Sequence, residues 1–331
     1  MEQMLIEGPG SLTRYPEFLS AFGASRPLLV GGKRHMDKFK AAACFSGYHP
    51  NPDLSDALDG AEMFKANGCD CLISIGGGSA IDTAKAIKYY LKDETLPHLA
   101  IPTTAGTGAE TTRYAVVYVD NRKTSLDFDW LTPDAVILDG DLLLSLPTYH
   151  KHSCLMDALA QGIESYWAKC STPETRIVAA RGIRAVMTEL ENYLAGHHLQ
   201  EMLKASYLCG KSIQLTRTTA PHAMSYALAK TYGIAHGHAV GLTLPWVWRA
   251  MAHDPAMTQT LKELESLLGG TGPEHLEALM ASLALTAPAA QPEDLDALAA
   301  SVNVQRLSNH PVPLTTAQLR HIYAQALKLA D

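Results

Sequence analysis

Residues 71–91 begin with the apolar run Cys71-Leu-Ile-Ser-Ile75, continue through Gly76-Gly-Gly-Ser79, and end with helical spacing from Ile81 to Leu91. A short apolar run bounded by glycines is typical of a buried strand. Glycines between a strand and a helix let the backbone approach a ligand closely, and the free N–H groups of the helix start attract an anion. The stretch therefore predicts a strand, an anion-binding turn and a helix. It is not the GxGxxG fingerprint of dinucleotide-binding proteins.

The same alternation of strands and helices continues on both sides of this stretch. Further strands are predicted at 26–30, 98–101, 115–119 and 135–138, and a helix at 55–67. Strands that alternate with helices indicate a mostly parallel sheet covered on both faces. The first half of the chain is therefore expected to be an α/β domain.

The pattern changes after Leu146-Pro147. Helical spacing dominates from there on, at 152–168, 173–194, 201–215, 222–232 and 236–252. A chain of 331 residues is also long for a single core. We therefore expect two domains, an α/β domain over residues 1–147 and an all-α domain over residues 148–331.

A second loop resembles the glycine turn in its chemistry. Residues 102–110, Pro-Thr-Thr-Ala-Gly-Thr-Gly-Ala-Glu, follow a predicted strand and carry hydroxyls at Thr103, Thr104 and Thr107. Asp82 falls in the first turn of the helix after the glycines, where it could cap that helix or bind a cofactor hydroxyl. One such loop is compatible with a merely tight turn, but two at strand ends favour a nucleotide. The candidate cofactor residues are Gly76, Gly77, Gly78, Ser79, Asp82, Thr103, Thr104 and Thr107.

Four candidate metal ligands lie in the second half: Asp157, Gln161, His222 and His236. Asp157 and Gln161 are four residues apart and share one face of a helix. One continuous helix would separate His222 from His236 by about 21 Å, which is too far for one ion. Gly233 offers a left-handed cap at which a first helix can end. The two histidines can share a metal only if the chain turns there.

Composition limits the remaining classes of function. The chain is 47% apolar with a net charge of −7 and has no long basic run, which argues against a nucleic-acid or membrane partner. Its start, MEQMLIEGPGSL, lacks the features of an export signal. Six cysteines without a CxxC pair are expected to be buried, reduced thiols. These observations favour a cytoplasmic protein.

Four motifs occur in an order that resembles the iron-containing, or group III, alcohol dehydrogenases. They are GGGSAIDTAKA at 76–86, IPTTAGTGAE at 101–110, MDALAQGIESYW at 156–167 and HAMSYALAKTYGIAHGHAV at 222–240. The resemblance implies a Rossmann-like α/β nucleotide-binding domain followed by an all-α domain. It also implies a fold shared with dehydroquinate synthase and a metal and substrate between the domains.

The resemblance also implies roles for particular residues. Gly77, Gly78, Ser79 and Asp82 match the family's pyrophosphate loop, and the three threonines of 103–107 match its second cofactor loop. Lys123 and Asn51 match further cofactor contacts. Three metal ligands are implied at Asp157, His222 and His236.

Two positions depart from the family pattern. Gln161 and Tyr226 stand where members usually carry histidine. An amide oxygen is a neutral donor and a weaker ligand than imidazole. Three arrangements are therefore open: Gln161 ligates through oxygen, three protein ligands act with water, or metal binding has been lost.

The choice of cofactor follows from the end of the first strand predicted above. Family members that prefer NAD tend to carry an acid there, whereas this chain has Gly31-Gly32-Lys33-Arg34-His35. The missing acid and the adjacent cations, Lys33 among them, suit a 2′-phosphate, so we expect a preference for NADPH over NADH. A solvated basic turn is the alternative. The metal expected from the family is Fe²⁺, and the same donors suit Zn²⁺, Mn²⁺, Co²⁺ or Ni²⁺.

The motifs are most similar to those of the phosphonoacetaldehyde reductase branch of the family. Such an enzyme reduces an aldehyde to a primary alcohol, here phosphonoacetaldehyde to 2-hydroxyethylphosphonate. A doubly charged substrate requires cations, for which Arg217 and Lys211 are the candidates. His238 and Tyr226 are candidates for proton transfer to the alkoxide.

Other functions stay open. The chain could be a broad short-chain aldehyde reductase, a non-redox lyase of the same fold, or a nucleotide-binding protein whose metal site has decayed. We expect a homodimer, because an exposed N-terminal strand in such folds often pairs with a second copy.

Overall fold

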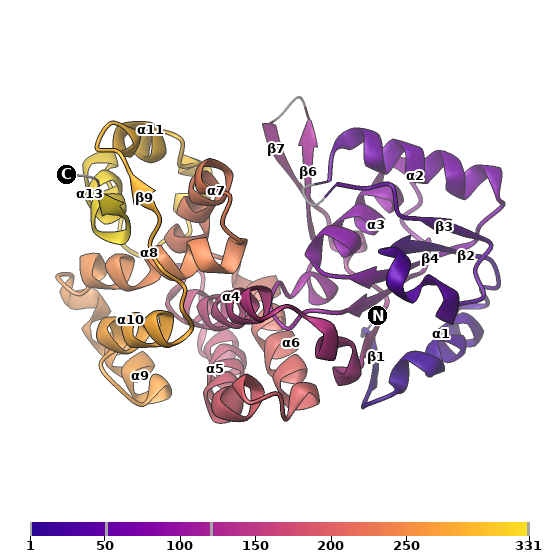
Figure 1. The fold of residues 1–331 in the computed structure, drawn as a ribbon, viewed down its shortest axis with the longest axis horizontal. Helices are drawn as coiled ribbons and strands as arrows, with labels where there is room; N and C mark the ends of the chain where they lie inside the picture. Colours follow the sequence, from indigo (N-terminus) through magenta and orange to yellow (C-terminus); the bar gives the residue numbers. More distant parts are fainter. Residues whose placement is uncertain (1, 50–51, 120–121, 330–331) are drawn as a thin grey trace. The chain divides into compact units, whose positions relative to one another are not determined.

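The computed structural model describes residues 2–49, 52–119 and 122–329 (Figure 1). It divides into two compact units. The first comprises Met1–Leu146 with Ala195–Tyr207, and the second comprises Pro147–Leu194 with Leu208–Asp331. The sequence prediction had counted residues 195–207 with the second domain. Each unit is described separately below.

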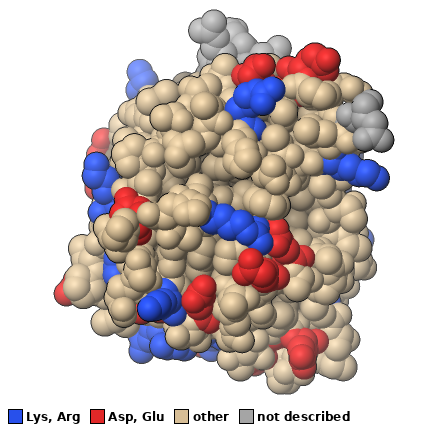
Figure 2. Space-filling model, turned by 90° about the vertical axis from the view of Figure 1, so that its left-hand side faces the viewer, with Lys and Arg blue, Asp and Glu red and all other residues tan. Residues whose placement is uncertain are grey.

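Charged side chains of both signs are mixed on the face of the molecule shown in Figure 2. Basic and acidic groups alternate there over short distances, and the chain as a whole carries a net charge of −7. The phosphates of nucleic acids are bound by continuous basic surfaces. The described residues of this face do not form such a surface.

The first unit is built on a six-stranded parallel sheet of order β1-β8-β5-β4-β2-β3. Its strands, in that order, are Met4–Glu7, Ala135–Leu138, His98–Pro102, Cys71–Gly76, Pro27–Gly31 and Ala43–Phe45. Among the described residues, three α-helices lie wholly within this unit: α1 Tyr15–Phe22, α2 Leu54–Ala66 and α3 Gly78–Leu91. The register pairs Gly76 with Pro102, so β4 and β5 end side by side. This register brings the glycine turn and the threonine loop to the same edge of the sheet.

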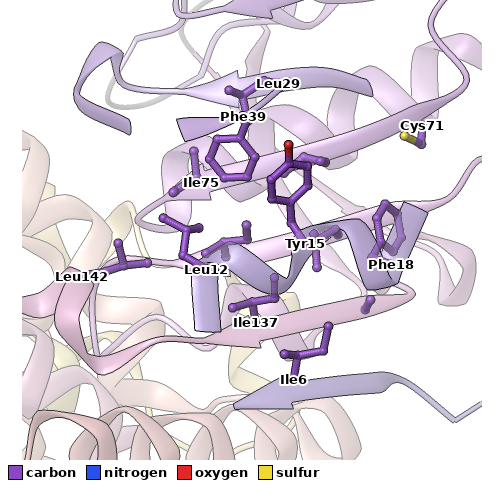
Figure 3. Packing of buried hydrophobic residues seen from close by; sticks show 14 residues of the cluster. Ile6, Leu12, Tyr15, Phe18, Leu29, Phe39, Cys71, Ile75, Ile137 and Leu142 are labelled. Carbon is purple, nitrogen blue, oxygen red and sulfur yellow. The ribbon is translucent and has the colours of Figure 1, made fainter. Parts of the chain in front are cut away.

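Alternate residues of the strands serve two separate cores. On one face, Leu29, Ile75 and Ile137 pack in one cluster with Phe18 of α1 (Figure 3). On the other face, the neighbouring residues of β2 and β4 pack against α2 and α3, and this core contains Leu28, Val30, Leu72, Ala61, Ala84 and Ile87. Because both faces are buried, the strands read as continuous apolar runs and not as alternating patterns.

A two-stranded antiparallel hairpin, β6 Tyr114–Val119 with β7 Arg122–Asp127, packs beside α3. The fully buried Lys85 joins α3 to residues 109–114, the segment that leads into β6. Its Nζ donates to the carbonyl oxygens of Ala109, Thr112 and Tyr114 at 2.6, 2.5 and 2.8 Å. Burial lowers the pKa of Lys85 to about 8, against the opposing charges of Asp82 and Glu110. The ammonium form therefore still predominates at neutral pH and supplies all three donors.

The second unit consists of helices. They are α4 Thr148–Trp167, α5 Pro173–Leu194, α7 Ala220–Tyr232, α8 His236–Met251, α9 Thr258–Leu268, α10 Gly272–Ser282, α11 Asp294–Ala300, α12 Val304–Leu307 and α13 Thr316–Ala326. The strands β9 Ala289–Ala290 and β10 Lys328–Leu329 pair in parallel. The chain passes between the two units within α6, Leu199–Thr216. No helix among the described residues is both long and apolar enough to cross a membrane.

The predicted α/β and all-α architecture is confirmed, with corrections at several elements. Helix α1 and strands β1, β3, β7, β9 and β10 were not predicted, and α4 begins at Thr148, four residues earlier than expected. The thiols are also not uniformly buried. Cys71 and Cys209 are buried, but Cys44 and Cys170 are exposed, because β3 is an edge strand and Cys170 lies beyond the end of α4.

Replacing Lys85 with methionine tests its role in the first unit. Lys85→Met keeps the length of the side chain but leaves three carbonyl oxygens without their donor. We expect the free energy of unfolding to fall by at least about 3 kcal/mol. The matched change Lys65→Met, at an exposed position of α2, should alter it by no more than about 0.5 kcal/mol. Chemical denaturation followed by circular dichroism measures both, and equal effects would contradict the assignment.

Candidate metal centre

Three side chains from three helices converge in the second unit. Asp157 of α4, His222 of α7 and His236 of α8 each offer one ligand atom, and these atoms lie within 4.8 Å of one another. The Nε2 of His222 lies 3.2 Å from Asp157 Oδ1, and the Nε2 of His236 lies 3.9 Å from the same oxygen. Asp157 and His222 are buried, and His236 is partly exposed. We call these three residues the triad.

A left-handed glycine brings the two histidines together. The helix α7 ends at Tyr232, and Gly233 has a φ of 64°, with its N–H bonded to Ala229 O. The helix α8 then begins at His236 itself. The two imidazole centres consequently lie 5.2 Å apart, although 14 residues separate them in the sequence. The predicted turn at Gly233 is confirmed.

A second glycine sets the distance between α8 and α4. A Cβ atom at Gly237 would lie 2.0 Å from Ser153 O and 2.7 Å from the Cβ of Asp157. Only a residue without a side chain fits there. The backbone next to His236 therefore approaches Asp157 as closely as two helices allow.

His222 is oriented by a carboxylate that the sequence analysis did not single out. The fully buried Glu164 of α4 pairs through Oε1 with His222 Nδ1. Its Oε2 accepts hydrogen bonds from Thr219 N and Thr219 Oγ1 at 2.6 and 2.8 Å. The hydroxyl of Thr219 in turn accepts from Trp167 Nε1 at 2.9 Å. This network fixes the imidazole with Nδ1 toward Glu164 and Nε2 toward Asp157.

Ser225 plays the corresponding part for His236. Its Oγ donates to His222 O at 2.8 Å and lies 3.3 Å from His236 Nδ1. A hydroxyl whose proton is already donated can accept the Nδ1–H of the imidazole. This assignment leaves the Nε2 lone pair of His236 directed at the triad. Both histidines therefore present the same ring nitrogen to the same point.

The electrostatics of the triad favour positive charge. Burial alone raises the pKa of the Asp157 carboxyl, but His236 and His222 outweigh burial and lower it. Burial lowers the pKa of the His222 imidazole, but Glu164 and Asp157 outweigh burial and raise it. In both cases the buried carboxylates demand a neighbouring cation. A divalent metal ion meets the same demand, and the two nitrogens and one carboxylate suit it as ligands.

Gln161 lies one helical turn beyond Asp157 and is also buried. Its Nε2 donates to Asp157 Oδ1 at 3.3 Å. Rotation of the amide by half a turn exchanges its nitrogen and oxygen positions. Gln161 therefore has the reach to present Oε1 at the triad, and its role as a ligand stays a prediction.

Tyr226 and His238 have different surroundings. The Tyr226 ring stacks on the His236 ring, with centres 5.5 Å apart and an interplanar angle of 14°. The Nδ1 of His238 instead lies 3.1 Å from Tyr149 Oη, and its Nε2 lies 3.1 Å from Thr286 O. Both ring nitrogens of His238 are thus engaged in packing α8 onto its neighbours. Of the two candidates for proton transfer, Tyr226 has the direct contact with the triad.

The two candidate cofactor loops lie against each other in the first unit. Positions for a Cβ at Gly77 and Gly78 lie 3.5 Å from Thr104 and 3.1 Å from Thr107, respectively. Gly77 is the N-cap of α3 and no side chain caps the helix there, and the N–H groups of a helix start attract an anion. The Oγ1 of Thr104 is buried without a hydrogen-bond partner among the described residues. An anionic cofactor at this loop would satisfy it.

The remaining predicted site residues have varied positions. Asp82 does not cap α3, because its Oδ2 accepts from Val116 N at 3.1 Å and so holds β6. Lys33 is exposed at the start of the 3-10 segment Lys33–Lys38. The others with a described position are Gly76 at the end of β4, the partly buried Ser79 on α3, the partly buried Thr103 after β5, the half-buried Lys211 on α6 and the exposed Arg217. Asn51 and the side chain of Lys123 lie outside the described part of the chain.

The sequence did contain a sign of Glu164. Asp157, Gln161 and Glu164 stand at positions i, i+4 and i+7, which place all three on one face of α4. Three side chains that can hydrogen-bond, repeated at helical spacing, indicate a polar network in the core. Ser225 lies three residues beyond His222 and could have been found by the same spacing.

The structure combines two adjoining glycine- and threonine-rich loops in an α/β unit with a carboxylate–histidine triad in a helical unit, an arrangement suited to a protein that binds a nucleotide and a metal ion. Comparison with known families agrees. The iron-containing alcohol dehydrogenase domain matches residues 3–140, and the C-terminal domain of the Fe-containing alcohol dehydrogenase family matches residues 152–327. The chain belongs to the iron-containing alcohol dehydrogenase family.

Individual relatives cover the chain to different extents. The NAD-dependent methanol dehydrogenase of Bacillus methanolicus is 31% identical over 248 residues, covering 69% of this chain and 65% of that protein. The chain thus spans slightly less than two thirds of that relative. The phosphonoacetaldehyde reductase of Streptomyces viridochromogenes is 29% identical and covers 99% of this chain and 93% of that protein.

A solved structure of similar fold is sulfoacetaldehyde reductase from Bifidobacterium kashiwanohense in complex with NAD⁺. It aligns with a TM-score of 0.88 and 26% identity, over 98% of this chain and 97% of that one.

Glu164→Gln tests the orientation of His222. The substitution keeps the shape of the side chain but removes the charge that holds the Nδ1 proton. We expect the affinity for a divalent metal ion to fall by about 10- to 100-fold. Isothermal titration calorimetry with Zn²⁺ measures this, and Glu191→Gln, at an exposed position of α5, is the control. Equal affinities for the two variants would contradict a role of Glu164 at the metal.

Gln161 is tested by two replacements with opposite expected effects. Gln161→His introduces a stronger ligand, so we expect tighter metal binding than in the unchanged protein. Gln161→Leu removes the oxygen donor, and we expect binding about 10-fold weaker. Zinc titration with a competing chelator measures both affinities. Unchanged affinity in Gln161→Leu would show that three protein ligands suffice.

Proposed function

We propose that the chain reduces an aldehyde to a primary alcohol with NAD(P)H and a divalent metal ion. The observation that carries this proposal is the convergence of Asp157, His222 and His236, each oriented by a neighbouring buried group. We further propose that residues 1–147 bind the cofactor and that residues 148–331 hold the metal. When bound, the ion supplies Lewis acidity toward the carbonyl oxygen.

The chain's own residues contribute orientation and a proton. Glu164 and Ser225 hold the two imidazoles in one tautomer, so the ligand atoms need no rearrangement. When bound, NAD(P)H would supply the hydride for the carbonyl carbon; the C=O π bond would break as the C–H bond forms, and the oxygen would take up a proton. We assign the delivery of that proton to Tyr226 Oη, because its ring stacks directly on His236.

For the cofactor, the two-loop site of the first unit supports a dinucleotide. Thr104, Gly77 and the start of α3 provide hydrogen-bond donors for its phosphates. Lys33, exposed just after β2, supports NADPH over NADH. Two of the named relatives are associated with NAD and not with NADP: the methanol dehydrogenase is NAD-dependent, and the sulfoacetaldehyde reductase structure contains NAD⁺. Preference therefore has to be measured with both cofactors.

For the substrate, we propose phosphonoacetaldehyde, which would give 2-hydroxyethylphosphonate. The relative that covers 99% of the chain carries that reductase name. The solved relative named above acts by its title on sulfoacetaldehyde, another two-carbon aldehyde with an acid group on the neighbouring carbon. A short uncharged alcohol is the second candidate, because the methanol dehydrogenase is 31% identical.

The proposed reaction is tested by following NAD(P)H absorbance with metal-loaded protein. We expect kcat/KM for phosphonoacetaldehyde to exceed that for propanal by at least about 100-fold, and NADPH to serve better than NADH. Equal rates with the two aldehydes would refute the phosphonate assignment but keep aldehyde reduction. No oxidation of either cofactor would favour the lyase or the decayed site.

His222→Ala is the control for the metal in this assay. It should lose both bound metal and turnover, because it removes one of the three ligands. Retention of the metal would contradict the assignment of His222 as a ligand.

A homodimer stays a further prediction, supported by the edge position of β1 and tested by light scattering.

A further inference from the structure

A guanidinium group lies next to the triad, although it comes from a distant part of the chain. Arg306 belongs to α12, whose start is capped by Asn303 Oδ1. Its Nη1 donates to Tyr226 Oη at 2.6 Å, and its Cζ lies 4.8 Å from the centre of the Tyr226 ring. Eighty residues separate the two side chains in the sequence. The contact is therefore a product of the tertiary fold.

The tyrosine connects this arginine to a metal-ligating histidine. Tyr226 stacks on His236 at 5.5 Å, and Arg306 Cζ lies 4.8 Å from the Tyr226 ring centre. Together these distances place the guanidinium carbon no more than 10.3 Å from the centre of the His236 ring. Arg306 is only partly exposed, so solvent screens its charge less than that of a surface arginine.

Guanidinium chemistry suits an acid group. Arginine carries five N–H donors in a planar fork, stays protonated, and binds oxyanions through two parallel hydrogen bonds. The bond to Tyr226 and the stacking on its ring restrict the rotamers of the guanidinium before a ligand arrives. A group restrained in this way loses less entropy on binding.

We propose that Arg306, held in place by Tyr226, binds the acid group of the substrate and so determines specificity for anionic aldehydes. The inference rests on the proposed aldehyde reduction. From an aldehyde oxygen to the far oxygen of an acid group on the neighbouring carbon is about 5 Å, and a charge-assisted hydrogen bond adds about 2.8 Å. A two-carbon substrate held beside the triad can therefore reach Arg306. Propanal carries no acid group with which to do so.

The two cations expected from the sequence have weaker structural support for this role. Arg217 is exposed and lies in left-handed backbone, with a φ of 63°, directly after α6. Lys211 is half-buried on α6 itself. Arg306, in contrast, contacts Tyr226, which stacks on His236 of the triad. Arg217 is for this reason the matched comparison in the experiment.

The experiment compares Arg306→Ala, Arg306→Lys, Tyr226→Phe and Arg217→Ala in the metal-loaded full chain. Steady-state kinetics use phosphonoacetaldehyde, sulfoacetaldehyde and propanal. In Arg306→Ala we expect kcat/KM for the two anionic aldehydes to fall about 30-fold more than that for propanal, mostly through KM. Arg306→Lys should recover part of this loss, because it keeps a positive charge. Tyr226→Phe keeps the ring stack but removes both the hydrogen bond and the proposed proton donor, so we expect kcat to fall for all three aldehydes and the preference for the anionic ones to weaken as well.

A second readout does not depend on turnover. Calorimetry with 2-hydroxyethylphosphonate, in metal-loaded and metal-free protein, should show weaker binding in Arg306→Ala than in Arg217→Ala in both states. Equal losses for all three aldehydes, unchanged product binding, or a larger effect of Arg217→Ala would overturn the assignment. If the unchanged protein reduces propanal, but Arg306→Ala has the same ratio of kcat/KM between the anionic aldehydes and propanal as the unchanged protein, only this inference fails. If the unchanged protein reduces no aldehyde, the proposed function fails first.

Discussion

The contact between α8 and α4 at Gly237 is the constraint on which the metal centre depends. At this position the backbone of α8 touches Ser153 O, and a single methyl group would lie 2.0 Å from that oxygen. Gly237 directly follows His236 in the sequence, and Asp157 stands one turn beyond Ser153 on α4. Any displacement of α8 at this point therefore changes the distance between two ligands. The left-handed turn at Gly233 brings the chain back to α4, and Gly237 fixes how closely it approaches.

Buried charge provides the second constraint, and it acts through Glu164. Two carboxylates, Asp157 and Glu164, flank His222, and all three side chains are buried. Such an arrangement is costly unless a positive charge lies between them. Two hydrogen bonds from Thr219, whose hydroxyl in turn accepts from Trp167, stabilise Glu164 on the side away from the imidazole. The charge that remains uncompensated is thus directed at the triad, where a cation would bind.

Local features were predictable from the sequence, and contacts between distant segments were not. The Gly233 turn was expected, because a glycine between two helical patterns leaves few other conformations. The strand and helix around Gly76–Ser79 were expected because an apolar run, three glycines and helical spacing follow one another directly in the sequence. The hydrogen bond from Val116 to Asp82 was not, because it depends on how β6 packs on α3. The short strands β1 and β3 carry too few residues for a periodic pattern, and only their neighbours in the sheet define them.

Tyr226 shows how one substitution can connect two parts of the site. The family resemblance places a histidine at this position, and a phenol ring does not replace imidazole as a ligand for a soft or borderline metal. The aromatic ring of Tyr226 instead stacks on His236, and its hydroxyl and ring contact the guanidinium of Arg306. A histidine there would give up the phenolic acceptor that holds Nη1. Loss of an imidazole at the metal and gain of a positioned guanidinium therefore follow from the same side chain. Under the proposed role of Arg306, the departure at Tyr226 therefore changes what the site binds as well as how it binds metal.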